Sequence, residues 1–112
     1  MTTHRFRGRR KRNENLIVKA CLAWLRLNRF YAIRINAGAF RTERGGFYRM
    51  AIPGISDILA VKYGKLFCVE CKMPGRVQSP AQKQFEQDIT RAGAVYILVH
   101  DTLELEQKIG GG

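Results

Sequence analysis

The pattern of apolar positions divides the chain into helix-like and strand-like stretches. Between Glu14 and about Arg29 the apolar residues recur with a helical period, and Asn13 stands at the expected N-cap. That stripe consists of Ile17, Ala20, Cys21, Trp24, Leu25 and Leu27. Residues 30–36, 47–52 and 94–100 instead have strand propensity, because they are rich in β-branched and aromatic side chains.

Residues 54–72, with the sequence GISDILAVKYGKLFCVECK, predict a β-hairpin. Two apolar runs flank Tyr63-Gly64, and Gly and Pro bound the stretch on both sides. With Tyr63-Gly64 as a two-residue loop, Lys62 pairs with Lys65 and the register continues outward from there.

This register places two acids face to face. Asp57 then lies opposite Glu70, and the alternation of side chains puts both on one face with Lys72. Directly opposed residues have Cβ atoms about 4.5 to 5.5 Å apart. Two carboxylates beside an ammonium are typical of a divalent-cation site with an acid-base or charge-stabilising lysine. Alternatively, Asp57 is a turn residue, while Glu70 and Lys72 form a solvated ion pair.

Helices are expected after the hairpin and at the end of the chain. Ser79-Pro80-Ala81-Gln82 has a capping box with Pro at the first helical position, which predicts a helix from Pro80 to about Arg91. Gln82 is then expected to bond back to the Ser79 amide. Asp101 with Glu104 caps a short helix to about Ile109. The order of elements predicts an α/β domain with a mixed central sheet flanked by helices.

Three short motifs resemble those of the VRR-NUC domain in the PD-(D/E)XK nuclease superfamily. They are Pro53-Gly54-Ile55-Ser56-Asp57, Glu70-Cys71-Lys72, and Ser79-Pro80-Ala81-Gln82 followed by Phe85. The family pattern is G-x-x-D, E-x-K and a downstream helical Gln, and the resemblance spans roughly residues 14–100. It implies a restriction-endonuclease-like core with the order α-β-β-β-α-β and a metal-dependent nuclease activity on DNA.

The resemblance also implies a role for each matching residue. Asp57 and Glu70 would be ligands of Mg²⁺ or Mn²⁺, and the Cys71 carbonyl a further backbone ligand. Lys72 would be the catalytic lysine and Gln82 a helper that faces the site, so that Asp57, Glu70, Lys72 and Gln82 form the catalytic set.

Glu14 has two interpretations. Its spacing from Ile17, Cys21 and Leu25 places it on the buried edge of the helical stripe. It is either a first-turn acid favoured by the helix dipole or a third carboxylate directed toward the metal. Many relatives in the superfamily have a helical Glu ahead of the core motif.

The charge balance favours a polyanionic partner. The chain has 20 Lys and Arg against nine Asp and Glu, a net charge of +11. Six of the basic residues fall within Met1–Arg12, expected to be a flexible arm that grips phosphates or serves as a localisation or solubility tail. Residues 13–109 are expected to be a single nuclease domain, followed by a flexible tail at 110–112. The expected nucleic-acid contacts are Arg34, Arg41, Arg44, Arg49 and Arg76.

The remaining composition narrows the possibilities. No apolar run approaches a membrane span, and the N-terminus lacks the apolar region of a secretory signal. Cys21, Cys68 and Cys71 form an odd set, expected to be free thiols in a reducing compartment. The family resemblance implies that this compartment is the cytoplasm of a bacterium or phage-infected cell. A zinc or redox role for the C-x-x-C spacing is rejected, because residues three apart in a strand face opposite ways.

The sequence therefore favours a Mg²⁺- or Mn²⁺-dependent deoxyribonuclease. Small proteins of the resembled type act as homodimers on branched DNA such as Holliday junctions, which makes a structure-selective endonuclease the leading hypothesis. The alternative is a noncatalytic basic module that binds DNA or RNA, in which the two acids and the lysine are ordinary surface charges.

Overall fold

The computed structural model describes the backbone of residues 3–35, 39–41, 45, 47–49 and 52–110, and the side chains of 12–35, 45 and 52–110. In this part of the chain the helices are α1 (Thr3–Leu27), α2 (Pro80–Arg91) and α3 (Thr102–Ile109). The strands are β1 (Tyr31–Arg34), β2 (Ala39–Arg41), β3 (Phe47–Arg49), β4 (Ile58–Lys62), β5 (Lys65–Cys71) and β6 (Val95–Val99).

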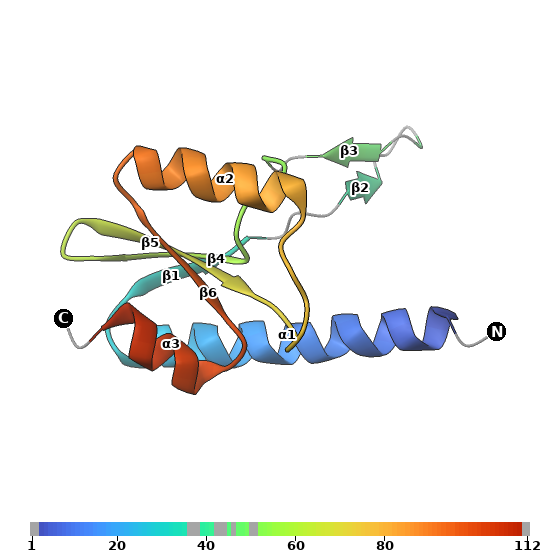
Figure 1. Cartoon of the computed structure of the whole chain (residues 1–112), viewed down its shortest axis with the longest axis horizontal. Coiled ribbons are helices and arrows are strands. Elements are labelled where there is room, and N and C mark those ends of the chain that lie inside the picture. Colours follow the sequence, from blue (N-terminus) through green and yellow to red (C-terminus); the bar gives the residue numbers. More distant parts are fainter. Residues whose placement is uncertain (1–2, 36–38, 42–44, 46, 50–51, 111–112) are drawn as a thin grey trace.

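Four of the strands form the central sheet, in the order β1-β4-β5-β6. The pairs β1/β4 and β4/β5 are antiparallel, whereas β5 and β6 are parallel and joined through α2. In Figure 1, α2 covers one face of the sheet, and α1 and α3 lie together against the other. The predicted α/β class with a mixed sheet and flanking helices is therefore confirmed.

The main core fills the space between the sheet and the α1/α3 layer. It includes the fully buried side chains of Cys21 and Leu25 from α1 and of Leu105 from α3. Ile58 and Val69, which are direct partners in β4 and β5, contribute from the sheet. Packing on this side leaves the opposite face of the hairpin, where the predicted acid pair lies, free to meet α2.

Three predicted elements agree closely with the structure. Lys62 pairs with Lys65 and Ile58 with Val69, which is the predicted hairpin register. The helix after the capping box spans Pro80–Arg91, as expected. The strand predicted at 94–100 is β6, and Asp101 caps α3 by accepting a bond from the Glu104 N–H.

The N-terminal helix begins earlier than predicted. It starts at Thr3 rather than Glu14, so the basic segment continues the helix and Asn13 is not its N-cap. The charge run contains no proline, and Arg and Lys are good helix formers, so the helix needs no apolar stripe to extend through it. The side chains of residues 1–11 lie outside the description.

The region between residues 36 and 52 also differs from the prediction. Residues 37–46, a basic stretch with several glycines that predicts a loop, contain β2, and the described residues Phe47–Arg49 of the strand expected at 47–52 form β3. These strands pair with each other in a separate two-stranded sheet. The partner of β1 is β4, a pairing between distant segments that local propensity does not specify.

No helix within the described residues is long and apolar enough to cross a membrane.

Candidate active site

Two carboxylates meet at the end of the β4/β5 hairpin that lies away from its turn. Asp57 directly precedes β4, and the pairing of Ile58 with Val69 brings it next to Glu70 on β5. Asp57 Oδ2 accepts a hydrogen bond of 2.8 Å from the backbone N–H of Cys71. This bond fixes the aspartate across the hairpin, so the two acids are held together by the backbone itself.

Glu70 is buried, with only 3% of its surface exposed. Its Oε2 accepts a hydrogen bond of 3.1 Å from Gln82 Nε2 and lies 3.9 Å from Lys72 Nζ. Its other oxygen, Oε1, is buried without a hydrogen-bond partner in the described part of the chain. A buried oxygen without a hydrogen-bond partner raises the free energy of the folded state, so the site favours a proton or a cation at Oε1.

The pKa values reflect the same crowding. Burial raises the pKa of Glu70 to about 8, the charge of Asp57 adds to the rise, and the ammonium of Lys72 opposes it. Burial also raises the pKa of Asp57, against the lowering effect of the Cys71 N–H bond. Two acids this close ionise together only when a positive charge is near, so the pair holds a proton or attracts a cation near neutral pH.

Gln82 fills both of the roles that the sequence left open. Its Oε1 accepts a bond of 2.8 Å from the Ser79 N–H, and its own N–H donates to Ser79 Oγ at 3.2 Å, which completes the capping box. Its Nε2 meanwhile donates to Glu70. The N-terminus of α2 is thereby tied directly to the acid pair.

Glu14 does not have the first-turn role offered as one alternative. Because α1 begins at Thr3, Glu14 lies well inside the helix, away from the positive end of its dipole. Its charge nevertheless raises the pKa of both Asp57 and Glu70, which places it near the site. Within the described residues, however, no three His, Cys, Asp or Glu side chains form a group that could hold a metal ion, and a ligating role for Glu14 stays a prediction.

Of the arginines expected to contact nucleic acid, Arg34 and Arg76 are exposed. Arg34 donates to Asn15 Oδ1 at 2.6 Å and lowers the pKa of Asp57, so it lies on the approach to the acids. The side chains of Arg41, Arg44 and Arg49 fall outside the described residues.

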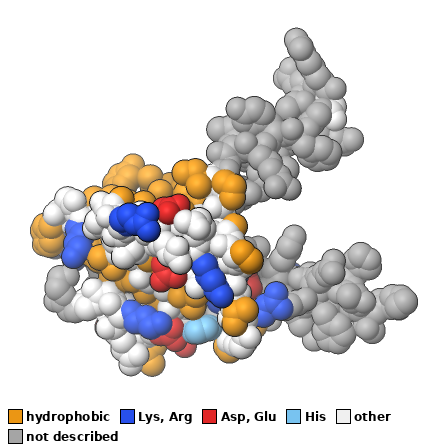
Figure 2. All heavy atoms as spheres, turned by 45° about the horizontal axis from the view of Figure 1, so that its top comes forward, with side chains coloured by type: hydrophobic (Ala, Val, Ile, Leu, Met, Phe, Trp, Pro, Cys, Tyr) orange, Lys and Arg blue, Asp and Glu red, His pale blue; other side chains and the backbone are white. Residues whose placement is uncertain are grey.

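The basic charge is not gathered into one patch on the face shown in Figure 2, where Lys and Arg are interspersed with acidic and apolar side chains. Eight of the twenty Lys and Arg side chains belong to residues 1–11, 36–44 and 46–51, outside the description.

The three cysteines are buried free thiols. Sequence reasoning assigned Cys71 a ligating carbonyl but missed its N–H as the donor that orients Asp57. Its carbonyl role stays a prediction.

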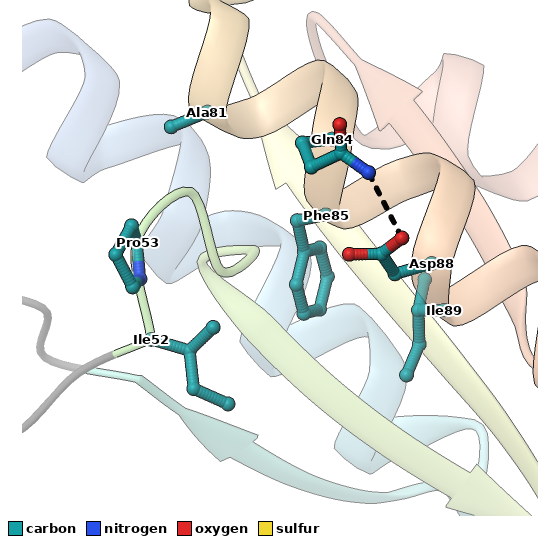
Figure 3. A pocket seen from close by; sticks show the side chains of 7 residues that line it. All are labelled: Ile52, Pro53, Ala81, Gln84, Phe85, Asp88 and Ile89. Atoms are coloured by element: carbon teal, nitrogen blue, oxygen red, sulfur yellow. Dashed lines mark hydrogen bonds between the residues drawn. The ribbon is translucent and has the colours of Figure 1, made fainter.

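An apolar pocket of about 610 Å³ lies apart from these carboxylates. Figure 3 shows Phe85 and Ile89 of α2 facing Ile52 and Pro53, with a Gln84–Asp88 hydrogen bond of 2.9 Å between neighbouring side chains. Its lining offers no buried acid or base. The candidate site is therefore the acid pair rather than this pocket.

Gly54 allows the loop before Asp57 to approach α2. A Cβ at this position would lie 2.1 Å from the Ala81 carbonyl oxygen, and the backbone has φ +76°. Both features require glycine, because a backbone atom cannot move aside cheaply and L side chains avoid positive φ. The glycine thus permits the contact between this loop and the helix that carries Gln82.

Gly54→Ala is expected to destabilise the fold by at least about 2 kcal/mol, because it adds a clash with backbone to an unfavourable φ. Urea unfolding measures the change. Gly75→Ala is the matched control, since Gly75 has φ +83° but open space where a Cβ would lie. Equal losses in the two variants would show that the approach to Ala81 carries no special cost.

The fold and the site together define an α/β domain with a buried carboxylate pair, an adjacent lysine and a helix-borne glutamine at one end of a hairpin. No protein-family model matches the chain, and no curated protein matches its sequence.

Proposed function

We propose that this chain is a metal-dependent deoxyribonuclease that hydrolyses phosphodiester bonds. The observation that carries the proposal is the buried, unpartnered Oε1 of Glu70 beside Asp57. Burying two like charges together is costly unless a cation or proton neutralises them. A binding surface alone has no need of such a pair, whereas a metal-dependent hydrolase does.

The donor set suits Mg²⁺ or Mn²⁺. These ions prefer oxygen ligands, and Mg²⁺ is often held by one or two carboxylates with water in its other positions. Asp57 and Glu70 would hold the ion, with the Cys71 carbonyl and, in the sequence prediction, Glu14 as further ligands. The bound ion supplies polarisation of the phosphoryl group and a water of lowered pKa.

The side chains around the pair have distinct tasks. The Nζ of Lys72 lies beside Glu70, and only 14% of the Lys72 side chain is exposed. Its positive charge would therefore stabilise the developing phosphorane in a partly desolvated setting. Gln82 fixes the orientation of Glu70, and the Cys71 N–H fixes that of Asp57. Rigid ligands of this kind reduce the reorganisation needed during reaction.

The order of elements supports a restriction-endonuclease-like core. Leaving aside the separate β2/β3 sheet and the final helix α3, the chain runs α1, β1, β4, β5, α2 and β6, the α-β-β-β-α-β order implied by the resemblance to VRR-NUC domains. The motif residues Asp57, Glu70, Lys72 and Gln82 also cluster in space. Membership of that family rests on these motifs and this order, and is part of the proposal.

The proposed substrate is branched DNA, such as a Holliday junction, cut by a homodimer. A single chain of this size offers little surface for a four-way junction, and a two-fold axis would present two sites to two strands. Digestion of single-stranded, duplex, flap and junction DNA, with Mg²⁺, Mn²⁺ or EDTA, tests the activity. Preferential metal-dependent cutting of the junction supports the proposal, and a panel left intact under all conditions contradicts it. Sizing chromatography tests the dimer separately.

A noncatalytic basic module is the alternative, favoured by the net charge of +11 and by the two-acid rather than three-acid site. Competition between RNA and branched DNA then identifies its partner.

Mn²⁺ is expected to raise the Tm of the wild-type chain, by an amount equivalent to about 2.7 kcal/mol at a hundredfold excess over Kd. Asp57→Asn should abolish this shift, because it removes one of two ligating charges. The matched control is Asp88→Asn, which changes an exposed acid of α2 that bonds to Gln84. DNA binding without any metal-dependent Tm shift in the wild type would favour the noncatalytic module.

A further inference from the structure

The turn of the β4/β5 hairpin, far from the acid pair, holds a tyrosine in an unfavourable conformation. Tyr63 has φ 51° and Gly64 has φ 75°, so both central residues of the two-residue loop are left-handed. Such loops favour Asn-Gly or Asp-Gly, because a bulky side chain is disfavoured at positive φ. Tyr63 is also 92% exposed, so packing within the chain does not compensate for the strained backbone.

The residues flanking Tyr63-Gly64 add a second unfavourable feature. Lys62 and Lys65 are direct partners in the hairpin register, and like charges placed opposite each other destabilise a sheet. Lys62 Nζ is held in place by a 2.9 Å bond to the Asn28 carbonyl, and lies 5.6 Å from the centre of the Tyr63 ring. The hairpin tip, residues 62–65, therefore presents an exposed tyrosine together with two lysines. Local features that oppose stability in this way commonly mark functional sites.

A shallow pocket lies beside the hairpin tip. It has a volume of about 420 Å³ and is lined by Lys62, Tyr63 and Lys65 of the tip together with Phe67, Val95, Ile109 and Gly110. The lining combines two amines with two aromatic rings and an apolar floor. Figure 1 shows this end of the hairpin next to the end of α3. An aromatic ring that carries an anionic group, such as a nucleotide, matches that combination.

We propose that the hairpin tip binds unpaired nucleotides, with a base stacked on Tyr63 and a neighbouring phosphate held by Lys65. A base within a duplex has both faces covered by its neighbours, so an exposed tyrosine selects single-stranded segments. Because β4 separates Tyr63 from Asp57, the two lie roughly 17 to 20 Å apart. The inference rests on the proposed function for its choice of DNA, and applies to branched DNA that carries a single-stranded segment away from the cut.

Tyr63→Asn separates a binding role from a structural one. Asn tolerates left-handed backbone, so this variant should have a slightly higher Tm than the wild type. If Tyr63 stacks on a base, the same change should weaken binding of an oligo-dT strand about tenfold, because base stacking on an aromatic ring is worth about 1 to 3 kcal/mol. Fluorescence anisotropy of the full chain with labelled oligo-dT, in EDTA to prevent cleavage, measures the affinity. Binding of blunt duplex should change less than about twofold.

Two further variants sharpen the measurement. Lys65→Ala should reduce the slope of log K against log salt by about 0.7, the value for one lost phosphate contact on a single strand. Tyr31→Ala is the matched control, because Tyr31 is a second exposed tyrosine, on edge strand β1, and should leave oligo-dT binding unchanged. A Tyr63→Asn variant that binds oligo-dT as the wild type does, or a wild type that does not bind it, overturns the inference.

The nuclease proposal fails or stands independently of this result. A chain that cuts DNA while its binding ignores Tyr63 loses only the hairpin-tip site. A chain that binds oligo-dT through Tyr63 but cuts no DNA with Mg²⁺ or Mn²⁺ retains the hairpin-tip site and loses the nuclease activity.

Discussion

Lys72→Ala is expected to lower DNA cleavage by about a hundred- to a thousandfold, the range found when one preorganised charge-stabilising donor is removed from an active site. The ammonium lies 3.9 Å from Glu70 and is largely shielded from solvent, so solvent cannot replace its charge at the reacting phosphate. DNA affinity should change little, since one of 20 basic residues is lost. Single-turnover cleavage with protein in excess separates the chemical step from binding.

Lys83→Ala is the matched control, because Lys83 is an exposed lysine on α2 and its loss should leave the rate within about twofold. The Tm of both variants should be measured, to exclude unfolding as the cause of lost activity. If the Lys72→Ala variant, purified free of contaminating nuclease, cuts DNA at the wild-type rate, Lys72 does not have the proposed catalytic role. Equal loss in both variants would point instead to weakened DNA binding.

The hairpin and the second helix were predictable because local signals fix them. Tyr63-Gly64 sets the loop length, and the alternation of side chains then places Asp57 opposite Glu70 without knowledge of the rest of the fold. The capping box fixes the start of α2 in the same way, and so brings Gln82 to a known position on its first turn. Most of the candidate site was therefore predictable from short-range sequence.

What sequence reasoning missed depends on contacts between distant segments. The pairing of β1 with β4 joins residues far apart in the chain, and the approach of Gly54 to Ala81 depends on how a loop packs on a helix. Asn15 was not recognised as the partner of Arg34, because nothing in the local pattern links a helix residue to a strand 19 positions later. The early start of α1 was missed for another reason. Its first residues are mostly charged, so they lack the periodic apolar positions by which a helix is recognised in a sequence.

Glu70→Gln is expected to stabilise the metal-free protein at alkaline pH, by on the order of 3 kcal/mol relative to its effect near pH 5. Folding raises the pKa of Glu70 from 4.5 to about 8, mainly through burial. The folded state therefore binds the proton more tightly than the unfolded state. The stability that this proton provides is complete below about pH 4.5 and is lost as the pH rises through about 8. The glutamine is neutral throughout, and its carbonyl can still accept the bond from Gln82.

Urea unfolding in EDTA at a series of pH values measures this effect. The wild type should lose stability between about pH 5 and about pH 9, whereas the Glu70→Gln variant should lose much less over the same range. The loss of stability that remains in the variant comes from Asp57, because the pKa of Asp57 is also raised. Glu106→Gln is the control, because Glu106 is exposed on α3 and should leave the wild-type profile unchanged. Adding Mn²⁺ should restore the stability of the wild type at high pH but not that of Glu70→Gln, because the ion replaces the proton only where both carboxylates remain. Parallel pH profiles for the wild type and Glu70→Gln would show that Glu70 ionises normally, which would remove the main physical reason for placing a metal at this pair.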